Sequence, residues 1–314
     1  VVTEAETGKV LACVSYPGYD NNRLANQMDV EYYYKLYNDD SLPMYNRATQ
    51  QLSAPGSTFK PVTIIAGLEE GVISAGTEVM CDGVFDRVAP ALQCWNRAGH
   101  GLVSGAANAL VHSCNDYLCE VLYRLGAEEN EEFSDSQALE VIQKYANMFH
   151  LDEKSGIELA ESSPQVTDRY AIPSAIGQGT NNYATVQLAR YVNTLANGGR
   201  SYELTLIERI SDTEQEPVLA DEIRISSESW NSVHEGMEGY AESTGIFDGL
   251  AVSVAGKSGT AQEQATEPDH GLFIGYAPAD QPQISVAVRI VNGYDSGSAV
   301  SCARTILESY FENK

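Results

Sequence analysis

A serine and a lysine stand three positions apart in the segment Ser57-Thr58-Phe59-Lys60. Residues at i and i+3 share one face of a helix, so the Lys60 amine can approach the Ser57 oxygen. A serine hydroxyl is a weak nucleophile until a neighbouring base takes its proton. Lysine can be that base when burial or a nearby cation lowers its pKa. The spacing indicates nucleophilic catalysis, although the same pattern also occurs in ordinary helix caps.

Two further short motifs follow in the chain. One is Ser113-Cys114-Asn115, and the other is Lys257-Ser258-Gly259-Thr260. The elements around the three motifs have to bring them together. Because Pro61 is best tolerated in the first turn of a helix, we expect a helix to begin near Ser57 and to continue through the apolar residues 62–68. Residues 104–125 are predicted as two helices broken near Ser113.

The rest of the pattern predicts an α+β fold, because strands lie toward both ends of the chain around a mostly helical middle. Expected strands cover residues 10–15, 204–210, 250–255, 271–276 and 284–291. Further helices are expected over residues 136–149, 185–197 and 298–311. Residues 20–54 are predicted as loop and short helix, 76–101 as loop, and the acidic run 128–135 as a solvated loop tip.

Composition bounds the class of protein. The chain has 314 residues, is 43% hydrophobic and carries a formal net charge of −25. That apolar content can form a sizeable core and excludes a disordered chain. A surface this acidic repels phosphate backbones, so no nucleic-acid partner is expected. Apolar stretches reach only about seven residues, whereas a membrane span needs roughly 20.

The ordered set Ser-x-x-Lys, Ser-x-Asn and Lys-Ser-Gly resembles the signature of penicillin-binding proteins and serine β-lactamases. Segments along essentially the whole chain resemble penicillin-binding protein transpeptidase domains, among them 46–48, 55–61, 177–179, 196–199 and 269–278. Residues 81–115 and 154–159 resemble the class B, elongation-type branch, which is similar to penicillin-binding protein 2. One departure is Ser258, where many relatives have threonine.

The resemblance implies a penicillin-binding protein/serine β-lactamase-like fold, with an antiparallel sheet flanked by helices plus an all-helical lobe. Residues 1–314 would form a single transpeptidase domain. Its sheet lobe would come from about 1–18 and 200–314, and its mainly helical lobe from about 19–199. The resemblance also implies an extracytoplasmic domain in the bacterial cell envelope, tethered by an upstream membrane anchor and pedestal that this sequence does not include.

The implied function is peptidoglycan D,D-transpeptidation, inhibited by β-lactams. Ser57 would attack the carbonyl of a D-Ala-D-Ala stem peptide, with Lys60 as the proton acceptor. Ser113 would relay the proton to the leaving D-Ala, and Asn115 would hold the substrate amide and help to orient Lys60. The implied partners are stem peptides, β-lactams and proteins of the cell-wall elongation complex. The resemblance also carries over Lys257 as a catalytic residue, which would supply positive charge toward the substrate carboxylate. The substrate-binding residues that it carries over are Ser258, Gly259 and Thr260.

Three other functions share these motifs. A class A β-lactamase carries a Glu-x-x-Leu-Asn segment for its deacylating water, and none lies between Asn115 and Lys257. A D,D-carboxypeptidase would use water in place of the acceptor amine. A non-catalytic β-lactam sensor would keep Ser57 and the cleft without turnover.

No cofactor is expected for the chemistry, but a structural zinc is. Cys81, Cys94, His100 and Cys114 supply three thiols and one imidazole, the ligand inventory of a closed zinc site. Relatives of the elongation type hold a zinc in this region, with ligands that resemble these positions. A Cys81–Cys94 disulfide and simple core packing remain alternatives at this point. Core packing is also the expected role of Cys13, Cys119 and Cys302.

Overall fold

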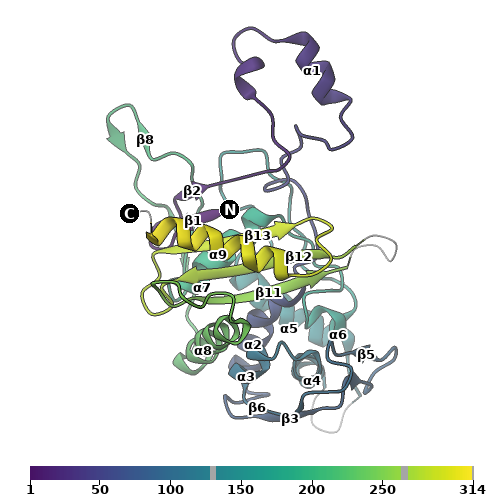
Figure 1. The fold of residues 1–314 in the computed structure, drawn as a ribbon. Helices are drawn as coiled ribbons and strands as arrows, with labels where there is room; N and C mark the ends of the chain where they lie inside the picture. Colours follow the sequence, from purple (N-terminus) through teal and green to yellow (C-terminus); the bar gives the residue numbers. More distant parts are fainter. Residues whose placement is uncertain (128–131, 263–267, 313–314) are drawn as a thin grey trace.

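A five-stranded antiparallel sheet lies across the middle of the protein (Figure 1). The computed structural model describes residues 1–127, 132–262 and 268–312. The strand order is β11-β12-β13-β1-β2, so the two ends of the chain meet in one sheet and β11 lies at an edge. The strands are β1 (Val2–Glu4), β2 (Val10–Ala12), β11 (Ala255–Ala261), β12 (His270–Ala277) and β13 (Ile284–Ile290).

Helices cover both faces of this sheet. Helix α9 (Gly297–Glu312) lies across the face that is in front in Figure 1, and α7 (Thr185–Ala196) lies behind it. Every residue of α7 is buried, and so is every residue of β12. This burial explains why β12, between β11 and β13, is an almost uninterrupted apolar run.

Five further helices pack below the sheet around α2 (Lys60–Glu69). Residues 60–67 of α2 are all buried, so α2 is the central helix of this part. Its neighbours are α3 (Ala106–Val111), α4 (Asn115–Leu125), α5 (Asp135–Met148) and α8 (Ser227–Thr244), with the short α6 (Ala171–Ser174) beside α4 and α5. Together the sheet and these helices form the α+β fold that the resemblance implies, and the fold class is confirmed.

Helix α8 is absent from our sequence-based expectations, because Gly236 and Gly239 weaken its helical pattern. The structure gives the reason for both glycines. A Cβ at Gly236 would lie 2.8 Å from the Leu110 side chain, and one at Gly239 would lie 2.9 Å from the Val111 side chain. The glycines therefore let α8 approach α3 closely.

Three other expectations are wrong. Residues 76–101 are not all loop, because β3 (Glu78–Cys81) pairs with β6 (Gly101–Ser104) and β4 (Val84–Phe85) pairs with β5 (Leu92–Gln93). Residues 250–254 are not strand, and β11 begins only at Ala255. In place of a strand over 204–210 the structure has β7 (Arg200–Tyr202), paired with β10 (Leu219–Glu222), and a small hairpin of β8 (Arg209–Ile210) and β9 (Thr213–Glu214).

One segment stands clear of the body at the top of Figure 1. It contains the short 3-10 helix η1 (Asn21–Arg23) and helix α1 (Val30–Tyr37). Arg23 pairs with Asp29, which also caps α1 by accepting a hydrogen bond from the Tyr32 amide. Local contacts therefore hold this segment together. Its loop and short helices agree with the expectation for residues 20–54.

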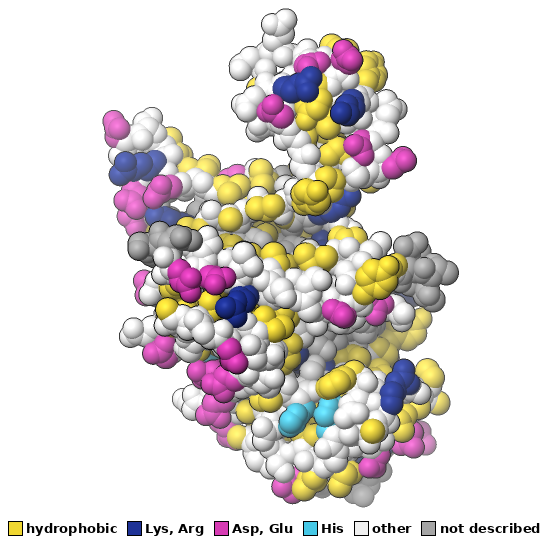
Figure 2. All heavy atoms as spheres, in the orientation of Figure 1, with side chains coloured by type: hydrophobic (Ala, Val, Ile, Leu, Met, Phe, Trp, Pro, Cys, Tyr) yellow, Lys and Arg dark blue, Asp and Glu magenta, His cyan; other side chains and the backbone are white. Residues whose placement is uncertain are grey.

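Acidic side chains are scattered over the face drawn in Figure 2, in keeping with the strongly negative charge of the chain. Of the predicted acidic loop tip, residues 128–131 lie outside the described residues, and Asp135 begins α5. Within the described part of the chain, no helix combines the length and the apolar character that a membrane crossing requires.

Candidate active site

Ser57 lies on a tight turn pressed against the edge strand β11. The turn is the 3-10 helix η2 (Gly56–Phe59), which runs directly into α2. Gly56 has a φ of 53°, and a Cβ there would lie 2.5 Å from the Thr260 carbonyl oxygen. A Cβ at Gly259 would lie 2.7 Å from the Pro55 carbonyl oxygen. Because Gly56 and Gly259 have no side chains, the backbone of the turn and the backbone of β11 can touch. This contact sets Ser57 beside Thr260.

Lys60 is fully buried one turn after Ser57. Its amine donates hydrogen bonds to the Asn115 Oδ1 at 2.7 Å, the Ser113 carbonyl oxygen at 2.7 Å and the Ser113 Oγ at 3.2 Å. Burial lowers the pKa of Lys60 to about 8. About half of the Lys60 side chains are therefore neutral near pH 8, as the expected base requires. Ser113 and Asn115 of the second motif are hydrogen-bonded directly to this amine.

The break between α3 and α4 gives the second motif its geometry. Ser113 has a φ of 49°, a left-handed conformation that non-glycine residues rarely adopt. This conformation turns the chain so that Ser113 and Asn115 both reach Lys60. Cys114, between them, is fully buried beside Cys81 and Cys94. The Cys114 side chain therefore lies among the other thiols, whereas Ser113 and Asn115 contact Lys60.

The third motif runs along β11 itself. Lys257 is fully buried, Ser258 is 9% exposed, and Thr260 is exposed at the surface. Burial, reinforced by the charge of Lys60, lowers the pKa of Lys257 well below its usual value. The Lys257 Nζ donates to the Ser258 carbonyl oxygen at 3.1 Å and lies 3.9 Å from the centre of the Tyr240 ring.

Tyr240 is a site residue that the sequence analysis does not find. It lies on α8, and its hydroxyl donates a hydrogen bond of 2.5 Å to the Ser258 Oγ. No local motif marks Tyr240, because only the packing of α8 against β11 brings it to the site.

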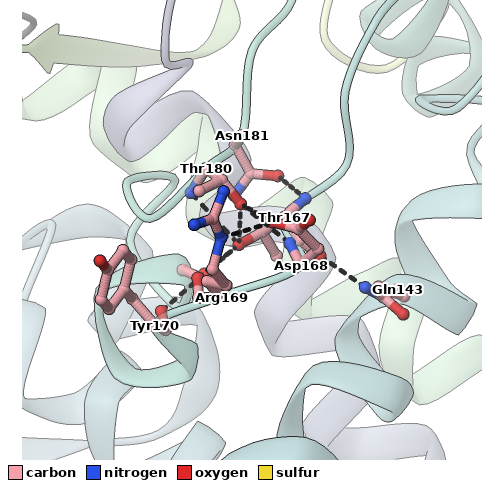
Figure 3. A network of polar contacts seen from close by, with 8 residues as sticks. Gln143, Thr167, Asp168, Arg169, Tyr170, Thr180 and Asn181 are labelled. Atoms are coloured by element: carbon pink, nitrogen blue, oxygen red, sulfur yellow. Dashed lines mark hydrogen bonds and ion pairs between the residues drawn. The ribbon is translucent and has the colours of Figure 1, made fainter.

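A polar network lies around Thr167 and Asn181 (Figure 3), and it adjoins the segment that contacts the turn carrying Ser57. The Gly56 amide donates to the Gly177 carbonyl oxygen at 3.1 Å, which joins the turn to the 177–179 segment. The Asn181 side chain holds this segment by donating to the Gln178 carbonyl oxygen and accepting from the Thr167 amide. The same network includes Gln143, Asp168, Arg169, Ser174 and Thr180.

The four predicted metal ligands form one cluster behind the second motif. One ligand atom from each of Cys81, Cys94, His100 and Cys114 lies within 4.8 Å of all the others. The His100 Nδ1 is 3.3 Å from the Cys81 Sγ and 3.6 Å from the Cys94 Sγ. All six cysteines are free thiols in the structure, so it contains no Cys81–Cys94 disulfide.

The cluster is also bonded to the second motif. The Cys94 Sγ accepts a hydrogen bond from the Asn115 amide at 3.4 Å, and the hydrogen bond from Cys114 lowers the pKa of Cys94 below its usual value. Of the other thiols, Cys119 is fully buried, whereas Cys13 and Cys302 are half-buried.

The environment of Lys60 predicts the pH dependence of acylation. Only the neutral amine can accept the Ser57 proton, so the acylation rate should rise with pH and level off above about 8. Stopped-flow measurement with a chromogenic β-lactam between pH 6 and 10 gives this profile. Lys60→Arg, which stays protonated, should be slow throughout. A flat wild-type profile would contradict the assignment of Lys60 as the base.

This fold and this arrangement of side chains define a class of protein. The family described as "Penicillin binding protein transpeptidase domain" matches residues 1–308, and the chain belongs to that family. The resemblance to penicillin-binding protein 2 is likewise confirmed by individual relatives.

One curated relative is the peptidoglycan D,D-transpeptidase MrdA of Acinetobacter baumannii, 27% identical over 98% of this chain and 50% of that protein. A crystal structure of Pseudomonas aeruginosa PBP2 in complex with WCK 5153 has a TM-score of 0.84, with 29% identity over 98% of this chain and 72% of the other. An imipenem acyl-enzyme complex of penicillin-binding protein A from M. tuberculosis has a TM-score of 0.84, with 26% identity over 98% and 72%. The chain spans about half the length of the first curated relatives that it matches.

Proposed function

We propose that this chain is the transpeptidase domain of a peptidoglycan D,D-transpeptidase that cross-links stem peptides through a serine acyl-enzyme. The observation that carries the proposal is the buried Lys60, bonded at once to Ser113 and Asn115 and placed one turn after Ser57. The name of the A. baumannii relative and the acyl-enzyme in the M. tuberculosis structure support it.

In the acylation step the Ser57 Oγ attacks the carbonyl carbon of the penultimate D-Ala, and the Ser57 proton passes to Lys60. The backbone N–H groups of Ser57 and Thr260 stabilise the oxyanion, each donor contributing on the order of 3 kcal/mol to the transition state. Ser113 relays a proton from Lys60 to the leaving amine, and D-Ala departs.

In the second step an acceptor amine attacks the ester carbonyl and gives up a proton, Ser57 recovers its proton, and a new peptide bond remains. A β-lactam acylates Ser57 in the same way, but its opened ring stays attached. Lys257, Ser258 and Thr260 bind the terminal carboxylate in both cases, while Gly259 allows the contact between β11 and the nucleophile turn.

The acceptor distinguishes this function from its alternatives. Incubated with a stem-peptide thioester and an acceptor amine, the protein should form the amide product faster than the hydrolysed acid. Mass spectrometry measures both products. Hydrolysis that outpaces transfer would favour a carboxypeptidase, rapid β-lactam turnover would favour a β-lactamase, and an acyl-enzyme that transfers to nothing would favour a sensor.

We further propose that Cys81, Cys94, His100 and Cys114 hold a structural zinc. Three thiolates and an imidazole suit zinc, and a tetrahedral site with zinc–sulfur bonds of about 2.3 Å separates its sulfurs by about 3.8 Å. The cluster needs only a small contraction to reach that geometry. The metal would take no part in the reaction and would brace Ser113 and Asn115 from behind.

The setting of the domain is part of the proposal. Residues 1–314 would act as a single transpeptidase domain, with a sheet lobe from about 1–18 and 200–314 and a mainly helical lobe between. We expect the full protein to be anchored in the bacterial cell membrane with this domain outside the cytoplasm. There it would bind stem peptides and β-lactams and work with other cell-wall elongation proteins. The peptidoglycan activity in the name of the A. baumannii relative supports this setting.

A further inference from the structure

Tyr240 contacts two neighbouring residues of β11 at once. Its hydroxyl donates to the Ser258 Oγ, and its ring lies under the Lys257 ammonium at 3.9 Å. Under the proposed function these two residues attract the terminal carboxylate of the substrate. Tyr240 therefore lies behind the carboxylate-binding residues, without being part of the signature motifs.

The hydrogen bond to Ser258 has a defined direction. A hydroxyl has one proton to give and two lone pairs to receive. Because Ser258 accepts from Tyr240, its own proton is free to be donated elsewhere. Ser258 and Thr260 share one face of the strand, since side chains two apart in β11 point the same way. On this face Thr260 is exposed, and Ser258 keeps 9% of its surface exposed.

The contact with Lys257 favours the charged form of a buried amine. Lys257 is fully buried, and both its burial and the nearby Lys60 lower its pKa. An aromatic face attracts a cation, most strongly where water is excluded. The Tyr240 ring thus offsets part of the penalty for keeping Lys257 charged, and a carboxylate can use only the charged form.

The backbone that carries Tyr240 is fixed. Met237 is one turn before Tyr240 and fully buried, and Gly236 lies in close contact with Leu110. Residues three and four positions apart share a helix face. The face of α8 that bears Tyr240 is therefore anchored in the core, which gives the ring and its hydroxyl little freedom to move.

We propose that Tyr240 is a positioning residue that orients Ser258 and Lys257 as a receptor for a carboxylate, and so sets the preference of the site for substrates with a free terminal carboxylate. This inference rests on the proposed function, because it takes Lys257 and Ser258 as the carboxylate-binding residues. It adds a determinant of substrate choice that lies outside all three motifs.

The test compares one β-lactam as its free acid and as its methyl ester. The measured quantity is the acid-to-ester ratio of the second-order acylation rate constants. Tyr240→Leu should lower this ratio about tenfold, because both contacts are lost. Tyr240→Phe keeps the ring and should fall in between. The loss should appear in the concentration for half-maximal rate more than in the maximal rate. Tyr37→Phe, a change at an exposed tyrosine of α1, should leave the ratio unchanged.

One result would overturn the inference alone: an unchanged acid-to-ester ratio in Tyr240→Leu. If both rate constants fell by the same factor, Tyr240 would only support the fold. Tyr240→Phe preserves the packing volume, so its intermediate ratio reports the loss of the hydrogen bond rather than a loss of packing. Wild-type protein that no β-lactam acylates at Ser57 would overturn the proposed function, and this inference with it.

Discussion

Ser57→Ala should abolish covalent labelling by β-lactams while leaving the protein folded. The Ser57 Oγ is the atom that we propose becomes acylated, because Ser57 lies one turn before Lys60 on the turn that contacts Thr260. Intact-protein mass spectrometry after incubation with penicillin should show the full adduct mass in wild type and none in the variant. Since Ser57 is only half-buried and its hydroxyl is small, the thermal unfolding midpoint should change little.

Ser113→Ala is the matched control. Ser113 contacts the same lysine, at 3.2 Å between the Ser113 Oγ and the Lys60 Nζ, but is proposed to relay a proton. This variant should label slowly and still at Ser57, as peptide mapping of the adduct would show. An adduct on Ser113 or Ser258 in the wild type would contradict the assignment.

Cys114→Ser should remove a bound metal and slow acylation together. We expect about one zinc per wild-type chain by elemental analysis and much less in the variant. A structural zinc binds its ligands with on the order of 10 kcal/mol, so its loss should also lower the unfolding temperature markedly. Acylation should slow because Cys114 separates Ser113 from Asn115, and both side chains hold the Lys60 amine.

Cys119→Ser is the control for Cys114→Ser. It shows how much stability is lost when a buried cysteine outside the cluster is replaced. Cys119 is fully buried on the same helix as Asn115 but lies outside the four-residue cluster. The Cys119→Ser variant should be somewhat less stable than wild type but should keep both its zinc and its acylation rate. Metal-free wild-type protein with full activity and a Cys81–Cys94 disulfide would end the zinc proposal.

Local sequence signals were sufficient for the nucleophile helix and for the helix break. Pro61 fixes the first turn of α2, and the apolar spacing on either side of Ser113 separates α3 from α4. Both predictions are confirmed because a short stretch of chain determines each of them.

The strand that carries the third motif could not be predicted in this way. Residues 250–255 have the apolar pattern of a strand, yet β11 is the glycine-rich stretch that follows, with Lys257 paired to Ile274 of β12. Gly259 lets β11 lie close to Gly56 and Pro55, which are about 200 residues earlier in the chain. A local sequence pattern cannot indicate such a long-range contact. For the same reason Tyr240 had no signal in the sequence.

The pairing of β1 with β13 has a consequence for how the protein forms. Val2 lies opposite Val286, so the sheet closes only when the two extremities of the chain meet. Joining such remote segments is entropically costly and slows folding. The nucleophile turn also rests on β11, late in the chain. During synthesis on the ribosome Ser57 and Lys60 therefore emerge long before β11, which carries the Thr260 amide of the proposed oxyanion hole. We expect activity only after nearly all of this domain has been made.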